Sequence, residues 1–342
     1  MRCRVPRRRR AWPAALAVVL ALAGGGCDAA ADAADAAGEL RPDPAPLAVG
    51  ERERLLVVAP HPDDEVLGAG GLIQRVIAGG GTADVLLVTA GDGYPDAVRG
   101  ETGLVSPAVS DFVAYGARRI AETHAALDAL GGAPGRVRVT ALGFPDGSLP
   151  ALRGAHWPRT TPVRSPTTGA TDPPYDGQVA DAAAPYAGEA LLDAMTQAVR
   201  RVRPTLVALP DPLDTHGDHA TAGWFALAAL ADAGSDARVA AFLVHWPSWP
   251  PGWDAAAIDA EASSRGLDLP PDLPPRGGAV ALALSPAELD VKRRAIARHA
   301  TQQRQMAVYL DAFVRVREPY TTLGAADAAH ARAALRAAPA AP

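Results

Sequence analysis

The chain has 342 residues, of which 49% are hydrophobic and 21% are charged, so it is long enough for one large globular domain or two small ones. Its 33 basic and 38 acidic residues give a net charge of −5; six arginines lie within the first 26 residues, and the remainder has 27 basic against 38 acidic residues, or −11. A chain this acidic is a poor candidate for nucleic-acid binding, which requires a basic face.

The first residues have the order of an export signal. The basic cluster Arg7–Arg10 precedes the apolar run Ala14–Ala23, which has roughly 10 residues against the about 20 that span a bilayer. Cys27 then follows three glycines, as in a bacterial lipoprotein signal. Residues 1–27 therefore predict an exported protein, secreted or held at the cell envelope, whose contact with a membrane is a lipid anchor on Cys27. The alternative is a cytoplasmic tail rich in arginine and alanine.

Three further regions follow from composition. Residues 28–53 are rich in Ala, Asp and Pro without helical or strand periodicity, so they predict a flexible linker. Residues 54–320 predict the ordered domain. The Ala-rich residues 321–342 predict a tail that forms either a terminal helix or no regular structure.

Short apolar runs alternate with amphipathic stretches along the predicted domain. The runs predict buried strands, and the stretches between them predict helices. This alternation indicates an α/β fold: a Rossmann-like three-layer sandwich with a mostly parallel sheet and helices on both faces. Ligands of such sheets bind beyond the carboxyl ends of the strands. The expected strands are 55–59, 84–89, 137–142, 205–209 and 239–245, and the expected helices are 67–77, 115–130, 189–202, 219–231 and 286–313.

A long stretch rich in Pro, Gly, Thr and Asp, residues 144–186, interrupts this alternation. A loop of this length inside a domain is uncommon and usually functional. We expect it to wall or cover the site, and the alternative is a disordered insertion.

The first candidate cluster directly follows the first predicted strand: His61-Pro62-Asp63-Asp64-Glu65. His61 and Asp64 are three residues apart, so a single turn could aim both at one point, and imidazole with carboxylate suits Zn²⁺. Asp63 then remains beside the metal to take a proton from water. The alternative, an acidic helix start, accounts for Asp64 and Glu65 but not for His61.

The second cluster, Asp214–His219, follows the fourth predicted strand. His216 and His219 again have three-residue spacing at the start of a helix. One of them could complete the metal ligands while the other acts as a general acid on the departing amine. Asp218 could hold the second nitrogen of an imidazole and fix its tautomer.

Together the two clusters predict a catalytic metal site. Two His and one Asp leave a coordination position open for water, whereas a structural zinc site is closed. The two cysteines, Cys3 and Cys27, form no CxxC pair, so the ligands must be nitrogen and oxygen. The predicted cofactor is Zn²⁺, although Fe²⁺ or another divalent metal suits the same donors.

These residues resemble the LmbE/PIG-L family of metal-dependent N-deacetylases, which act on N-acetylglucosamine-containing substrates. The resemblance covers roughly residues 54–318 and rests first on the two clusters. Three further segments agree with it: Arg119–Glu122 continuing to Gly131, Leu142–Gly147, and Lys292–Gln302.

The resemblance implies a role for each matching position of the metal site. His61, Asp64 and His219 match the zinc ligands, and Asp63 matches the general base that activates the bound water. Gly217 stands where the family commonly has Pro, and no ligand is lost by this difference.

The resemblance also implies roles around the metal. His216 matches the residue that steadies the oxyanion or protonates the leaving nitrogen, and Asp218 matches the residue that orients it. Arg119 and Asp146 match positions that contact the sugar of the substrate.

Other residues have two interpretations each. Glu65 either hydrogen-bonds a residue of the site or caps the helix. His299 could support the site by resemblance, or it could be a structural histidine. Gly68, Gly70 and Gly71 lack the spacing of a phosphate-binding loop, so they are expected to allow close packing of the helix on the sheet.

The sequence therefore predicts a zinc-dependent hydrolase that removes an N-acyl group, usually acetyl, from an amino-sugar-containing small molecule or glycan. Two alternatives stay open. One is an exported metal-dependent amidase acting on a non-sugar amide, and the other is a sugar-binding lipoprotein without catalytic activity.

Overall fold

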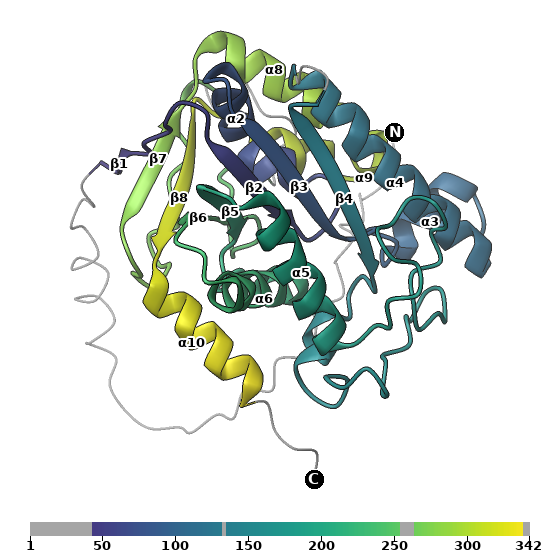
Figure 1. Ribbon diagram of the computed structural model, residues 1–342. Helices are drawn as coiled ribbons and strands as arrows, with labels where there is room; N and C mark the ends of the chain where they lie inside the picture. The colour runs from purple at the N-terminus through teal and green to yellow at the C-terminus, as the bar shows by residue number, and fades with distance from the viewer. Residues whose placement is uncertain (1–42, 132–134, 254–262, 338–342) are drawn as a thin grey trace, which may run out of the picture. The chain divides into compact units, whose positions relative to one another are not determined.

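Eight strands form one sheet in the order β1-β7-β8-β6-β5-β2-β3-β4 (Figure 1). The computed structural model describes residues 43–131, 135–253 and 263–337. Neighbouring strands are parallel except that β8 runs antiparallel to both β6 and β7, so the predicted mostly parallel α/β fold is confirmed. The strands are β1 (Ala45–Pro46), β2 (Arg54–Ala59), β3 (Thr82–Thr89), β4 (Val137–Phe144), β5 (Leu206–Pro210), β6 (Arg238–Phe242), β7 (Ala279–Ala283) and β8 (Arg317–Leu323).

Helices cover both faces of this sheet (Figure 1). The central strand β2 shows why: Leu55 and Val57 enter the core formed with α2, α4, α8 and α9, while Leu56 and Val58 enter the core formed with α5, α6 and α10. The helices are α2 (Asp64–Ala78), α3 (Pro95–Thr102), α4 (Val109–Ala129), α5 (Gly188–Val202), α6 (Gly217–Ala233), α8 (Pro286–Ile296), α9 (Ala300–Asp311) and α10 (Ala325–Arg336), with a 3₁₀ turn η2 (Leu149–Arg153).

Glycines let α2 approach the sheet closely. A Cβ atom at Gly68 would lie 2.3 Å from the ring of Phe242, and one at Gly71 would lie 2.3 Å from Leu284. These glycines therefore have the expected packing role, and they let α2 lie against the end of β6 and the residue that follows β7.

Several boundaries differ from the expected ones. The compact unit begins at Pro44, and β1 within the expected linker pairs with β7. At the other end, β8 crosses residue 320, and α10 buries Ala331 and Leu335 against α6, so the tail takes the helical alternative. The single helix expected over 286–313 is two helices, with His299 at the start of the second. The expected export signal, with Cys27, lies outside the described residues.

The long segment between β4 and α5 is built into the domain. Tyr175 and Tyr186 are buried, and the hydroxyl of Tyr186 donates to the carbonyl of Gly143 at 2.9 Å. Thr167 donates to the carboxylate of Asp92 at 3.1 Å, which ties the segment to the end of β3.

Within the described residues, no helix has the length and apolar character needed to cross a membrane.

Candidate metal centre and active site

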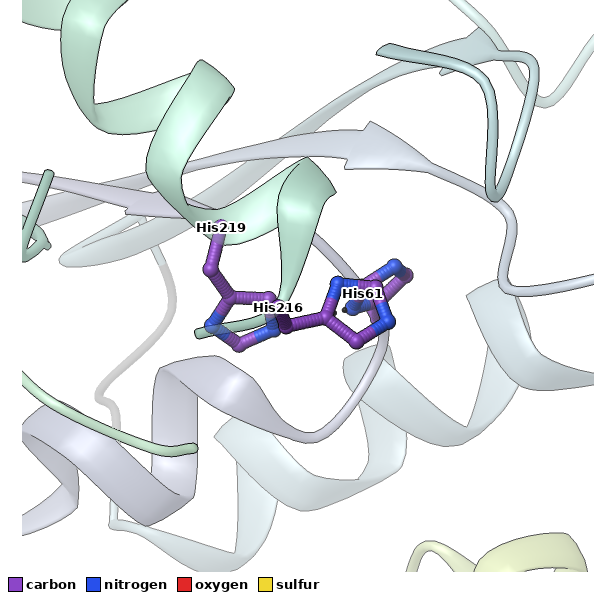
Figure 2. A group of neighbouring side chains, drawn as sticks. All are labelled: His61, His216 and His219. Carbon is purple, nitrogen blue, oxygen red and sulfur yellow. Dashed lines mark hydrogen bonds between the residues drawn. The ribbon is translucent and has the colours of Figure 1, made fainter. Parts of the chain in front are cut away.

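The two clusters meet at the carboxyl ends of β2 and β5, which are parallel neighbours in the middle of the sheet. The chain order reverses direction at this point, since β3 and β4 lie on one side of β2 and β5 lies on the other. Such a reversal is where α/β sheets bind their ligands. Figure 2 shows His61, His216 and His219 gathered at the start of α6.

The three expected metal ligands present their donor atoms to one point. Nδ1 of His61 lies 3.1 Å from Nε2 of His219 and 3.4 Å from Oδ2 of Asp64, and Nε2 of His219 lies 3.2 Å from the same oxygen. Ligands bound tetrahedrally at about 2.0 Å are separated from each other by about 3.3 Å. The triangle therefore has the dimensions of one face of a divalent-metal site, and its residues are buried.

The electrostatics of this triangle also favour a cation. Burial by itself opposes charge on each group, yet His219 and His61 hold the pKa of Asp64 well below its ordinary value. Burial likewise lowers the pKa of His219, but Asp64 and Asp214 more than offset this and raise it to about 9. A site that stabilises protons on its imidazoles stabilises a metal ion in their place.

Asp214 contacts the ring of His219 at the nitrogen that does not face the ligand triangle. Asp214 was given no role from the sequence. Its Oδ2 lies 3.3 Å from Nδ1 of His219 and accepts hydrogen bonds from the backbone of Val244 and His245. Its Oδ1 accepts from the backbone of His216 at 2.8 Å. A carboxylate on the second nitrogen of a ligating histidine fixes its tautomer. The signal in the sequence was the position of Asp214, four residues after the end of β5 and at the start of the second cluster.

Asp63 adjoins the triangle with an unusual backbone. Its φ is 126°, in the region that residues with a side chain rarely adopt. Burial raises the pKa of its carboxyl to about 7, against the lowering effect of Arg119. Such a carboxylate can take up and release a proton near neutral pH.

Arg119 is buried behind Asp63. Its guanidinium donates to Oδ2 of Asp63 at 3.2 Å, to the carbonyl of Pro62 at 2.6 Å and to the carbonyl of Gly91 at 2.7 Å. The side chain is only 5% exposed. Its observed contacts hold the turn of the first cluster, and the expected sugar contact stays a prediction.

Asp146 lies at the opposite side of His61 from the ligand triangle. Its Oδ1 is 3.1 Å from Nε2 of His61, and its Oδ2 accepts from the backbone of Gly93 at 2.6 Å. Asp146 therefore supports a candidate ligand, and its expected contact with the sugar of the substrate stays a prediction.

His216 caps the start of α6. Its Nδ1 accepts a hydrogen bond from the backbone N–H of Asp218 at 3.3 Å. A nitrogen that accepts carries no hydrogen, so the neutral ring of His216 carries its hydrogen on Nε2. Burial lowers the pKa of His216 to about 2, with the charges of His61 and His219 acting in the same direction.

The carboxylate of Asp218 contacts the second nitrogen of an imidazole, as expected from the residues, but that imidazole is His61 and not His216 as the resemblance implied. It accepts from the backbone of Gly147 at 2.6 Å and of Leu149 at 3.0 Å, and it lies 3.3 Å from Nε2 of His61. The backbone of Asp218, not its carboxylate, contacts His216. Asp218 joins the start of the long segment to the metal centre instead.

His245, three residues after the end of β6, is a further member of the site that was given no role in it from the sequence. Its ring centroid lies 4.9 Å from that of His216 and 4.5 Å from that of His219. Its Nδ1 is 3.5 Å from Oδ1 of Asp214. Asp214, His219 and His245 could themselves gather around a cation, as could His61, His216 and His219.

This fold and site together have the architecture of a metal-dependent hydrolase, with a buried carboxyl group next to a His-His-Asp set that could hold a metal ion. Residues 56–230, just over half of the chain, match the model of the PIG-L family, described as GlcNAc-PI de-N-acetylase. The chain belongs to the PIG-L family and is a deacetylase.

Named relatives agree with this membership. The chain is similar to the 1D-myo-inositol 2-acetamido-2-deoxy-alpha-D-glucopyranoside deacetylase of Rhodococcus opacus (strain B4), at 29% identity over 73% of this chain and 81% of the relative. The protein of the same name from Kineococcus radiotolerans is 33% identical over 60% of this chain and 53% of that protein.

Two solved structures are also similar. The teicoplanin deacetylase Orf2 in its zinc-inhibited form has a TM-score of 0.48 and 20% identity, covering 79% of this chain and 98% of that one. The N,N'-diacetylchitobiose deacetylase of Pyrococcus horikoshii has a TM-score of 0.47 and 17% identity, covering 80% and 84%.

Proposed function

We propose that this protein removes the acetyl group from the nitrogen of an N-acetylglucosamine-containing substrate, at a divalent cation held by His61, Asp64 and His219. The observation that carries the proposal is the triangle of ligand atoms 3.1–3.4 Å apart; Asp63, next to Asp64 in the chain, has a buried carboxyl group that interacts electrostatically with Asp64. The deacetylases named above supply the substrate class.

Zinc is the cation we propose, and Fe²⁺ is the alternative that suits the same donors. When bound, such an ion polarises the amide carbonyl and makes a water molecule easier to deprotonate. The protein residues around it then perform the proton transfers.

Asp63 is the general base in this proposal. Its buried carboxylate, with the pKa raised to about 7 by burial and partly offset by Arg119, takes a proton from the attacking water. The water oxygen adds to the amide carbon, and the carbonyl oxygen gains negative charge.

His216 stabilises that oxygen as a neutral hydrogen-bond donor. Its Nδ1 is occupied by the backbone of Asp218, so Nε2–H is the donor that faces the developing charge. A ring at a helix N-terminus with a pKa lowered to about 2 by burial does not carry the proton that the leaving nitrogen needs. Asp63 therefore returns the proton it took. The C–N bond breaks, the nitrogen leaves as an amine and the acyl group leaves as acetate.

Arg119 and Asp146 remain the candidate substrate contacts. We assign Arg119 mainly to holding Asp63, because its guanidinium is buried on that carboxylate. Asp146 begins the long segment after β4, and we assign to it the contact with a sugar hydroxyl.

We also propose that the protein is exported. The basic cluster Arg7–Arg10, the apolar run after it and Cys27 support this, with Cys27 as the lipid attachment site. Cell fractionation of the wild type and Cys27→Ala tests it. Wild type in the membrane fraction and Cys27→Ala in the soluble exported fraction would support the anchor, and cytoplasmic retention of both would contradict export.

The experiment that tests the activity is an amine-release assay on zinc-loaded protein. The panel contains N-acetylglucosamine, its inositol glycoside and diacetylchitobiose, with N-acetyl amino acids as non-sugar amides. We expect release from the sugars. Release from the amino acids alone would replace the proposal with a non-sugar amidase, and stoichiometric zinc without release from any amide would replace it with a binding protein.

A further inference from the structure

The general-base residue Asp63 is held in a strained backbone conformation. Its φ of 126° and ψ of −30° place it well outside the regions favoured by residues with a side chain. Such a conformation is unfavourable and persists only where the surroundings impose it. The contacts that impose it therefore determine where the carboxylate points.

The backbone of Asp63 is fixed at each of its polar groups. Its N–H donates to Oε2 of Glu65 at 3.0 Å, and its carbonyl accepts from the backbone of Val66 and Leu67, which begins α2. The preceding carbonyl, of Pro62, accepts from Arg119. Among these contacts, the one with Glu65 joins a side chain to the backbone N–H of Asp63 itself.

Glu65 is in turn held from a distant part of the chain. Its Oε1 lies 2.9 Å from Nε2 of His299, and both residues are fully buried. Neither of these two atoms has a hydrogen-bond partner elsewhere in the part of the chain that the structure describes. His299 stands at the start of α9, where the helix expected from the sequence is interrupted.

We propose that Glu65 and His299 form a positioning pair that holds Asp63 in its strained conformation and so aims the base at the site. The inference rests on the proposed role of Asp63. In the proposed mechanism, Glu65 and His299 contact neither the substrate nor the cation. They act through Asp63, while two of the candidate ligands keep supports of their own. The carboxylate of Asp64 accepts a hydrogen bond from the backbone N–H of His61, and the ring of His219 lies against Asp214.

The test is a double-mutant cycle with a metal-affinity readout. Glu65→Leu removes the acceptor of the Asp63 amide, Glu65→Gln keeps one, and His299→Leu removes the distant partner. We expect kcat to fall about 100-fold in Glu65→Leu and about 10-fold in His299→Leu, with KM and zinc affinity within about threefold of wild type, because a small misplacement of a catalytic group can cost about 10² in rate. Glu65→Gln should retain more activity than Glu65→Leu.

Thr301→Val is the matched control. It removes a side-chain hydrogen bond of 2.6 Å to Glu122 from the same first turn of α9 and does not contact Asp63. We expect kcat within about twofold of wild type. A loss equal to that of His299→Leu would show that any disturbance of α9 has this effect, and would overturn the proposal.

Combining Glu65→Leu with Asp63→Ala tests whether Glu65 affects the rate through Asp63. If Glu65 acts through Asp63, Glu65→Leu has no further effect on the residual rate of Asp63→Ala. An additive loss, or a parallel loss of zinc affinity, would overturn the proposal. A crystal structure of Glu65→Leu gives a readout that does not require activity: residue 63 should leave positive φ, and an unchanged φ would contradict the pair. If wild type released no amine from any substrate, the proposed function would fail while this structural readout would still decide the inference.

Discussion

Oδ2 of Asp214 lies 3.3 Å from Nδ1 of His219, on the side of the ring away from the other candidate ligands. This contact leaves Nε2 of His219 unprotonated when a cation is bound. The same carboxylate accepts from the backbone of His216 and His245, so one residue contacts both histidines of the second cluster, His216 and His219, and also His245.

Asp214→Asn should therefore weaken zinc binding by about 10- to 100-fold, as removal of such a partner typically does. Asp211→Asn is the matched control, because Asp211 is equally buried three residues earlier and pairs with Arg276 rather than with the site. Competition with a coloured chelator measures both affinities. An equal loss in the two variants would show that Asp214 matters only for folding.

Asp63→Asn and His61→Ala should separate catalysis from metal binding. Asp63→Asn removes the base and should lower kcat by about 10²- to 10⁴-fold while one equivalent of zinc stays bound. His61→Ala removes one of the three donor atoms of the ligand triangle and should lose both zinc binding and turnover. Metal analysis beside the amine-release assay distinguishes them, and undiminished turnover in Asp63→Asn would remove the proposed base.

Zinc affinity should rise with pH up to about 9. Without metal, Asp64 and Asp214 outweigh burial and raise the pKa of His219 to about 9, so this ring is protonated below that value. Zinc must displace this proton and also the one on His61, whose pKa lies well above its ordinary value because Asp146, Asp218 and Asp64 outweigh burial. Affinity should therefore change by at least about tenfold per pH unit. Titrations at pH 6, 7 and 8 measure the slope, and an affinity independent of pH would contradict this ligand assignment.

Asp92 should make stability depend on pH. Burial, together with the neighbouring Asp146, raises the pKa of Asp92 to about 6 from its ordinary value of 3.8. The folded state therefore binds this proton more tightly, so the stability that the protonated group contributes is complete below pH 3.8 and is lost as pH rises through 6.

Asp92→Asn keeps an acceptor for Thr167 and removes this titration. It should raise the free energy of unfolding at pH 8 by up to about 3 kcal/mol and leave it nearly unchanged at pH 4. Urea denaturation of the metal-free protein at the two pH values measures the difference. An equal change at both would show that packing, not ionisation, governs this position.

The parts of the molecule with local patterns were predictable from the sequence. The strands that carry the site are continuous apolar runs, and each cluster begins within a few residues of the end of its strand, so His61, Asp64 and His219 could be brought together by a parallel-sheet argument. By contrast, β8 contains Arg317, Glu318 and Pro319 and has no such run. Its strand character comes from pairing with β6 and β7.

The supporting contacts could not be predicted because they join distant segments. Glu65 and His299 are far apart in the sequence, and nothing in the composition of 297–299 breaks a helix. Asp218 has a suitable spacing to orient His216, but its side chain points to the backbone of Gly147 and Leu149. Side-chain direction at a helix start depends on the loop that packs there.

The antiparallel strand β8 has a consequence for how the site is assembled. It lies between β6 and β7, and its Glu318 accepts from the backbone of Gly71 and Leu72 in α2 and from the chain's buried Lys292. The helix that begins with the first metal-binding motif is thus braced by a residue made some 250 positions later. We expect a nascent chain ending before Arg317 to have neither a complete sheet nor a finished metal centre, so that activity arises only once synthesis has passed this strand.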